Sequence, residues 1–258
     1  MRMLVARLHP RIELAKLALW FNAWKTAWLE RRMLAACDLI VAFTAEDAAR
    51  FRLQQSGKTV VVIPPGYGGP HARPRDLSLT KRVILLLGSY RWIAKRSNLQ
   101  TFLNAAEAPL HEAGIEVRVV GNMTPAYRAW LARRFPHVTI VGRVSEVTSE
   151  LEGARLGLIV ESAGGGFKLK LLDYLFARLP IAALNGSMAG TLLQPDVHYI
   201  DAEGITELTD KIIARIDDIA YLTELADAAY AACAGGYDWP TRGKQFLHAV
   251  ALAAAARS

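Results

Sequence analysis

Cysteine is scarce in this 258-residue chain, which contains only Cys37 and Cys233. Two cysteines cannot build a disulfide framework or a four-ligand zinc site. The sequence therefore fits a reducing compartment, and we expect a cytoplasmic location.

Long apolar runs are also missing. The longest stretch without a charged residue, 179–195, contains two prolines, Asn185 and two glycines, so we expect no membrane-spanning segment. Near the N-terminus, Arg2 and Arg7 flank the short apolar run Met3–Ala6, which cannot serve as an export signal.

Two glycine motifs of nucleotide-binding proteins are absent. The turn Gly88-Ser89-Tyr90-Arg91 does not match G-x-G-x-x-G, and G-x-x-x-x-G-K-[ST] occurs nowhere in the chain. These absences argue against a nicotinamide-dependent dehydrogenase and against a P-loop nucleotide hydrolase.

Charge is unevenly spread. Residues 1–143 hold 22 Lys and Arg against 9 Asp and Glu, whereas residues 144–258 hold 9 against 15. A basic front half indicates an anionic partner, such as a phosphate-bearing ligand, an anionic membrane surface or nucleic acid, although solvated arginines on ordinary helices are the plainer explanation. Because the chain has no zinc pattern, aromatic-basic interleaving or RNA-binding motif, we expect no nucleic-acid partner.

Short runs rich in Val, Ile and Leu alternate with amphipathic stretches. Uninterrupted apolar strands are typical of parallel sheets buried on both faces, so the pattern predicts an α/β fold with a doubly wound unit from about Lys81 to Asp218. The expected strands are 39–43, 60–63, 83–87, 117–120, 138–141, 156–160 and 180–184. The expected helices are 45–54, 98–113, 126–135, 146–152, 168–179 and 206–216.

One linker is evident at 64–70, where the sequence P-P-G-Y-G-G-P interrupts regular structure. It separates a front piece, 1–68, from the unit expected over 69–236, and residues 237–258 are expected to form a helix that packs back towards the front piece. Only two strands are expected in the front piece, and two strands do not form a stable layer alone. We therefore expect it to be the last part of another α/β domain whose earlier strands are absent.

Three glycines follow the expected strand 156–160. The sequence there is Glu161-Ser162-Ala163-Gly164-Gly165-Gly166-Phe167-Lys168-Leu169-Lys170. Glycine amides can approach an anion closely before a helix, and the two lysines add positive charge, so the segment indicates a phosphate site. The alternative is a tight turn without a ligand.

Two further glycine turns follow expected strands. Gly88-Ser89 is followed closely by Arg91 and Lys95, and Gly121-Asn122 ends the next strand. The carboxyl ends of parallel strands line the ligand crevice of an open sheet, so we expect these turns to face the phosphate site.

The run 164–181 resembles the donor-site signature of family 4 glycosyltransferases of the GT-B fold, in the subgroup with three glycines, a Leu-Lys pair and a following acidic residue. Other segments are similar to further motifs of that family, and the resemblance covers about residues 30–250. They are the strand and turn at 83–92, the second strand end at 119–121, the base-side loop at 141–144, the crossover at 38–43 and 60–66, and the aromatic motif at 237–239.

The resemblance implies a nucleotide-sugar site that needs no metal or other cofactor. Asp173 would bond the ribose hydroxyls, and Lys170 with Lys168 would neutralise the leaving diphosphate. Glu161 is a further catalytic candidate, and Gly165 replaces a glutamate that many members carry. The other residues expected to bind the donor are Gly88, Ser89, Arg91, Lys95, Gly121, Asn122, Arg143, Val144, Gly164, Gly165, Gly166, Phe167 and Leu171.

Trp20, Trp24 and Trp28 recur at helical spacing in a basic segment. Such a stripe fits a helix lying on anionic lipid at the inner face of a membrane. The plainer interpretation is a core face that packs against a sheet, including one formed by the absent strands.

These features predict a glycosyltransferase of the hexosyl-transferring kind. The resemblance implies transfer from a nucleotide-sugar donor to a glycan or lipid-linked acceptor, with retention of configuration, as in polysaccharide synthesis. The alternative is a non-catalytic nucleotide-sugar-binding or partner-dependent module.

Overall fold

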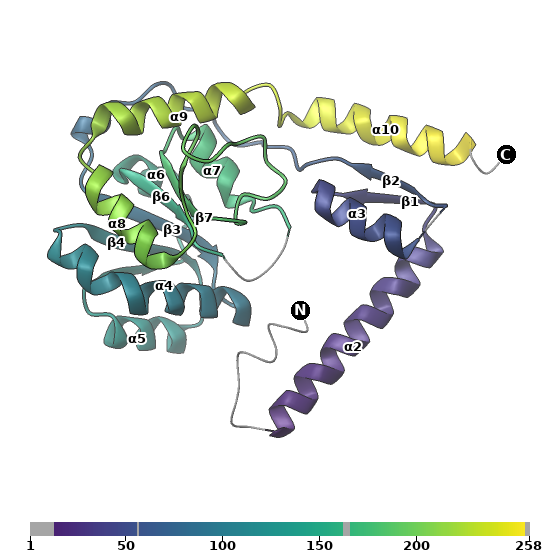
Figure 1. Cartoon of the computed structure of the whole chain (residues 1–258), viewed down its shortest axis with the longest axis horizontal. Coiled ribbons are helices and arrows are strands. Elements are labelled where there is room, and N and C mark those ends of the chain that lie inside the picture. The colour runs from purple at the N-terminus through teal and green to yellow at the C-terminus, as the bar shows by residue number, and fades with distance from the viewer. Residues whose placement is uncertain (1–12, 56, 162–165, 256–258) are drawn as a thin grey trace.

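A parallel six-stranded sheet forms the centre of the larger of two units (Figure 1). The computed structural model of the chain describes residues 13–55, 57–161 and 166–255. The strands follow the spatial order β5-β4-β3-β6-β7-β8, and each neighbouring pair is parallel. They are β3 (Val83–Ser89), β4 (Glu116–Asn122), β5 (Val138–Gly142), β6 (Leu156–Ile159), β7 (Ile181–Leu184) and β8 (Ile200–Ala202).

Helices cover both faces of this sheet, which is why its central strands β3, β6 and β7 are almost entirely apolar. One buried cluster lies beneath α4 (Ile93–Glu112), α5 (Pro125–Arg134) and α8 (Ile205–Arg215). The other lies beneath α6 (Thr148–Gly153), α7 (Lys170–Phe176) and the C-terminal part of α9 (Ile219–Cys233), whose first half packs on the first cluster. The α/β architecture expected from the sequence is therefore confirmed.

The strand order reverses between β3 and β6. The chain runs from β3 to β4 and β5 towards one edge of the sheet, and from β6 to β7 and β8 towards the other. The helices that follow β3 and β6, α4 and α7, lie on opposite faces of the sheet. A crevice therefore opens beyond the carboxyl ends of these two strands.

Tyr174 fixes α7 above the junction of β3 and β6. Its hydroxyl accepts a hydrogen bond from the Leu87 amide at 2.8 Å and lies 3.0 Å from the Leu85 carbonyl oxygen. Its ring packs on Gly157, where a Cβ atom would come within 2.8 Å of the ring. This contact holds the first turn of α7 beside the crevice.

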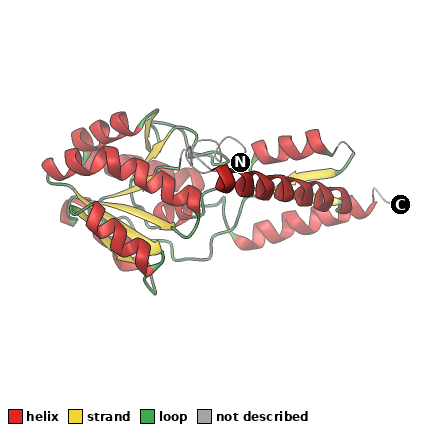
Figure 2. Ribbon diagram, turned by 90° about the horizontal axis from the view of Figure 1, so that it is seen from below, coloured by secondary structure: helices red, strands yellow, loops and turns green. Residues whose placement is uncertain are grey.

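The smaller front unit has its own small core. It consists of α2 (Glu13–Ala36), β1 (Leu39–Ala42), α3 (Ala45–Gln54) and β2 (Thr59–Val62), and β1 pairs with β2 in parallel. The C-terminal helix α10 (Trp239–Ala255) lies along this unit and contacts β1. Figure 2 shows these helices projecting away from the larger unit.

The chain crosses between the units twice, and the two crossings are bonded to each other. The Tyr67 amide donates a hydrogen bond to the Tyr237 carbonyl oxygen at 2.6 Å, and Tyr67 forms a parallel bridge with Asp238. Gly66 packs so closely on the ring of Trp239 that a Cβ atom there would lie 2.5 Å from it.

The tryptophan stripe on α2 is exposed. Trp20, Trp24 and Trp28 are 55%, 45% and 42% exposed, so no strand among the described residues covers them. The described strands therefore do not form the sheet that the plainer interpretation expects, and packing against strands outside the described residues stays a prediction. In the described ranges, no helix is long and apolar enough to cross a membrane.

Most predicted elements are confirmed to within about two residues, but α4 and α7 differ. Helix α4 begins at Ile93, five residues earlier than predicted, without a side-chain cap at Trp92. Helix α7 spans 170–176 rather than 168–179, because Arg178 has a left-handed backbone (φ +50°) and Pro180 follows. The short strand β8 and helix α9 were not predicted.

Candidate functional site

A cavity of about 570 Å³ opens at the point where the strand order reverses. Loops that follow β3, β4, β5 and β6 form its wall together with the first turn of α7. Most residues predicted for the donor site meet there. They are Gly88, Ser89, Lys95, Gly121, Asn122, Arg143, Val144, Glu161, Phe167, Lys168, Lys170 and Asp173.

Three predicted residues that the structure describes do not line the cavity. Arg91 is exposed to solvent, and Leu171 is buried in the core beneath α7. Gly166, with φ +82°, precedes the wall residue Phe167. Gly164 and Gly165 lie outside the described residues.

Sequence patterns missed several wall residues, because apolar side chains beside turns carry no distinctive motif. Trp92 is 73% exposed and Leu169 is 60% exposed, and both line the cavity. The available signal in the sequence was a tryptophan four residues after Gly88, in the turn that follows the strand. The remaining missed residues are Leu87, Ala94, Val120 and Val147.

Glu161 and Lys170 form a buried ion pair. The Glu161 Oε1 and Lys170 Nζ atoms are 2.6 Å apart, and their side chains are only 8% and 11% exposed. Burial lowers the pKa of Lys170, and the Glu161 carboxylate opposes this shift. Lys170 therefore pairs with Glu161 and not with Asp173, the alternative partner that helical spacing suggests.

Lys168 and Lys95 bring further positive charge to the cavity. Lys168 Nζ donates a hydrogen bond to the Gly166 carbonyl oxygen at 3.1 Å. Burial lowers the pKa of Lys168, Glu161 and Asp47 raise it, and Lys95 lowers it further, so these charges lie close enough to interact. In contrast to Lys170, Lys95 makes no ion pair with any described residue.

Asp173 lies between this cavity and a second one of about 770 Å³. The linker that includes Tyr67 and the loop around Val147 line the second cavity, and Val147 also borders the first. Burial raises the pKa of Asp173, and burial together with the Asp173 carboxylate raises the pKa of Tyr67. Among the described side chains, none forms an ion pair with Asp173, so its oxygens are available to hydroxyl donors.

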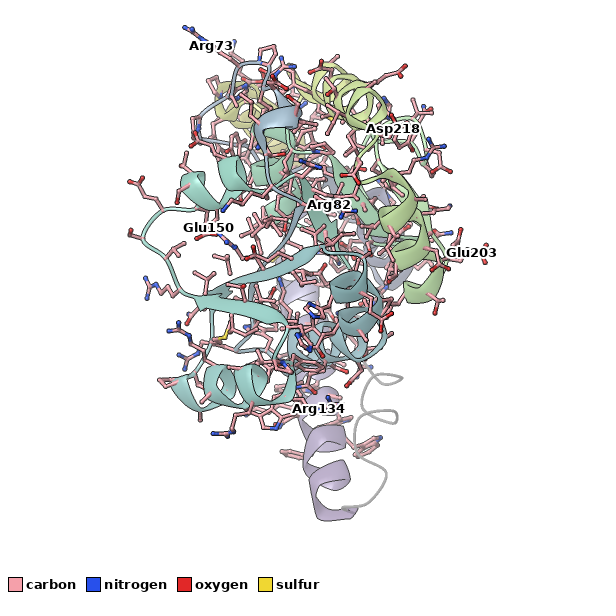
Figure 3. All side chains as sticks on the ribbon, turned by 90° about the vertical axis from the view of Figure 1, so that its left-hand side faces the viewer. Arg73, Arg82, Arg134, Glu150, Glu203 and Asp218 are labelled. Atoms are coloured by element: carbon pink, nitrogen blue, oxygen red, sulfur yellow. The ribbon has the colours of Figure 1, made fainter. Side chains whose placement is uncertain are left out.

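The second cavity is built around a buried arginine. Arg75 donates hydrogen bonds to the carbonyl oxygens of Leu151, Glu152 and Ala154, at the end of α6. Arg73, at its rim, extends outward from the molecule (Figure 3). Arg75 thus holds the C-terminal end of α6 against the segment that precedes β3, and sequence patterns did not predict this cavity.

No group of three or more His, Cys, Asp or Glu side chains in the described part of the chain could hold a metal ion. The cationic side chains that line the cavity are Lys95, Lys168, Lys170 and Arg143.

Residues 81–218 match the family model of the group 1 glycosyl transferases. The match covers more than half of the chain and includes the sheet from β3 to β8 and its cavity. The chain belongs to this family. Among curated proteins, no sequence matches it.

Solved structures with the same fold include other glycosyltransferases. S. aureus TarM is 12% identical with a TM-score of 0.72, and the match covers 87% of this chain and 46% of TarM. Anabaena HepE is 16% identical with a TM-score of 0.66, and the match covers 83% of this chain and 63% of HepE. The sucrose-phosphate synthase of Thermosynechococcus elongatus is 17% identical with a TM-score of 0.69, and the match covers 89% of this chain and 61% of the synthase.

These likenesses confirm the GT-B type of fold predicted from the sequence. The group 1 glycosyl transferase described here spans about half the length of TarM and about three fifths of HepE and the synthase. The shared part includes the larger unit, which contains the cavity.

Proposed function

We propose that the cavity binds a nucleoside diphosphate sugar and that the chain serves as the donor-binding half of a glycosyltransferase. The observation that carries this proposal is the combination of Lys95, Lys168 and Asp173 in one wall at the strand-order reversal. Cations suit the diphosphate, whereas a carboxylate free of ion pairs suits the ribose hydroxyls.

Two of the solved structures with the same fold support the nucleotide part of the proposal. TarM was crystallised with UDP, and HepE with UDP and glucose. In this chain the loop with Arg143 and Val144 follows β5, at one end of the cavity, and it would lie beside the base.

The reaction would break the bond between the anomeric carbon and the diphosphate oxygen and form a bond from that carbon to an acceptor hydroxyl oxygen. The hydroxyl proton would pass to the leaving diphosphate, with retention of configuration. Negative charge develops on the leaving oxygen, and Lys168 and Lys95 are placed to stabilise it.

The acceptor would be a glycan or a lipid-linked glycan in the cytoplasm. Contact of α2 with an anionic membrane is the less favoured part of the proposal. An interfacial helix carries its apolar residues on one side, whereas those of α2 are spread around the helix.

A second candidate is a non-catalytic nucleotide-sugar-binding module. It is favoured by the front unit, where only two strands are present among the described residues. Turnover of a nucleotide-sugar by the chain, with release of free nucleoside diphosphate, would distinguish the enzyme from the module.

Thermal unfolding in the presence of UDP, GDP, ADP and their glucose or mannose conjugates tests the proposal. We expect at least one diphosphate to raise the unfolding midpoint, because a ligand that binds only the folded chain stabilises it. If no nucleotide shifts the midpoint and calorimetry detects no binding, the donor-site proposal is wrong.

A further inference from the structure

Glu161 lies directly after β6, at the strand-order reversal. Its side chain is 8% exposed yet lines the cavity. The Ser187 hydroxyl donates a hydrogen bond to the Glu161 carbonyl oxygen at 3.2 Å, which ties this position to the loop after β7. The carboxylate therefore sits on an anchored backbone in the wall of the cavity.

Only one oxygen of this carboxylate is satisfied. Oε1 pairs with Lys170, while Oε2 is buried and has no hydrogen-bond partner in the described structure. A buried acceptor without a donor costs folding free energy, and such groups are uncommon in folded proteins. An unsatisfied acceptor in the wall of a binding cavity indicates a ligand that supplies the missing donor.

The missing donor is not a phosphate. A carboxylate repels a diphosphate, whereas a hydroxyl group can donate a hydrogen bond to it. Lys170 compensates the charge of Glu161, so the pair adds no net charge to the cavity. Besides Lys170, three cationic side chains line the cavity, Lys95, Lys168 and Arg143.

The two carboxylates of the cavity occupy different places. Asp173 borders the second cavity, whereas Glu161 lines only the first. Arg143 and Val144 follow the edge strand β5. Glu161 follows β6, which lies three strands away from β5 in the sheet. A nucleotide with its ribose at Asp173 and its diphosphate at the lysines leaves Glu161 to the sugar.

We propose that Glu161 is a specificity-determining residue for the transferred sugar. Its free oxygen accepts a hydrogen bond from a sugar hydroxyl, and Lys170 acts as a positioning residue that holds the carboxylate in place. This assignment rests on the proposed function. It gives Lys170 a different role from direct neutralisation of the diphosphate.

The test compares the affinity for a nucleoside diphosphate with that for its sugar conjugate. Calorimetry would use UDP with UDP-glucose, GDP with GDP-mannose and ADP with ADP-glucose, on the full chain. The variants are Glu161→Gln and the double variant Glu161→Met/Lys170→Met, which removes the ion pair without leaving a buried unpaired charge. Glu207→Gln is the matched control, because Glu207 pairs with Lys211 at 2.8 Å and lines neither cavity.

We expect the double variant to weaken binding of the sugar conjugate at least fivefold relative to the diphosphate alone, and Glu207→Gln to leave this ratio unchanged. A ratio that stays within twofold of wild type in the double variant would overturn the assignment, and Glu161 would then be only a counterion. If the wild-type chain binds none of the six ligands, the proposed function fails and the assignment fails with it. Far-UV circular dichroism of each variant checks that the fold is retained.

Discussion

Gly121 packs against Gly88 in the wall of the cavity, where β4 and β3 end side by side. A Cβ atom on Gly121 would lie 1.7 Å from the Gly88 carbonyl oxygen, and the φ angle of Gly121 is +142°. Both the space and the backbone conformation therefore require glycine at this position.

Replacing this glycine should destabilise the larger unit. We expect Gly121→Ala to lower the free energy of unfolding by about 1–3 kcal/mol, because the strand ends must separate and the backbone is strained. Urea unfolding followed by circular dichroism measures this change. The control is Gly153→Ala, since a Cβ atom there meets nothing within 4 Å; an equal loss in the control would show that the Gly121–Gly88 contact is not the cause.

Lys95 should carry part of the affinity for a diphosphate. Because no described side chain forms an ion pair with Lys95, its charge is available to a ligand in the cavity. We expect Lys95→Gln to weaken binding of a nucleoside diphosphate by about 1–2 kcal/mol, the scale of a charge-assisted hydrogen bond.

Calorimetry with the diphosphate that stabilises the wild type would check this value. Lys81→Gln serves as the control, because Lys81 is exposed and lines neither cavity. Unchanged affinity in Lys95→Gln would contradict the placement of the diphosphate.

Asp173 should distinguish nucleotide binding from generic anion binding. A carboxylate repels phosphate but accepts hydrogen bonds from ribose hydroxyls. We expect Asp173→Asn to weaken binding of a nucleoside diphosphate by about 1–3 kcal/mol and to leave pyrophosphate binding unchanged or tighter. Equal weakening of both ligands in calorimetry would show that Asp173 has a structural role.

The same residue should give stability and binding a dependence on pH. Burial raises the pKa of Asp173 in the folded chain above 3.8, so its contribution to stability is present below that value and is lost as the pH rises through the raised pKa. Asp173→Asn should therefore gain stability relative to wild type as the pH rises, and wild-type nucleotide affinity should fall as the carboxylate becomes protonated. The free energy of unfolding of both proteins, measured as a function of pH, checks this. If the difference between the two proteins does not change with pH, the prediction is wrong.

The exposed aromatic residues of α2 should promote self-association. Trp20, Trp24 and Trp28 form an exposed aromatic row on α2, and exposed apolar surface of this kind favours contact with other protein. We expect concentration-dependent association in sedimentation velocity and a reduction when all three are changed to Ser. A wild-type chain that sediments as a monomer at all concentrations would contradict it.

The sequence predicted the larger unit well because its strands are buried on both faces. Its central strands appear as nearly continuous apolar runs, such as Val83–Leu87, and the turns after the strands carry the glycines and lysines of the cavity. Gly88, Gly121 and Lys168 could therefore be assigned to one site before their positions in space were known.

Other features depended on contacts between distant residues. The pairing of Lys170 with Glu161 depends on how α7 lies over β6, which no local spacing in the sequence indicates. The second cavity exists because Arg75 reaches the end of α6, a contact between segments about 76 residues apart. Leu171 was assigned to the site by its neighbours, but its place on α7 turns it into the core.

The paired crossings at Tyr67 and Tyr237 determine how the two units can move. A single linker would let the front unit rotate about it in any direction. Here two chain segments cross side by side and are bonded to each other, so rotation about either segment alone is restricted. Twisting the front unit about its long axis would break the bond between Tyr67 and Tyr237 and pull Trp239 away from Gly66. Bending about the line of the crossings would keep both contacts, so this connection resists twisting of the front unit more than bending.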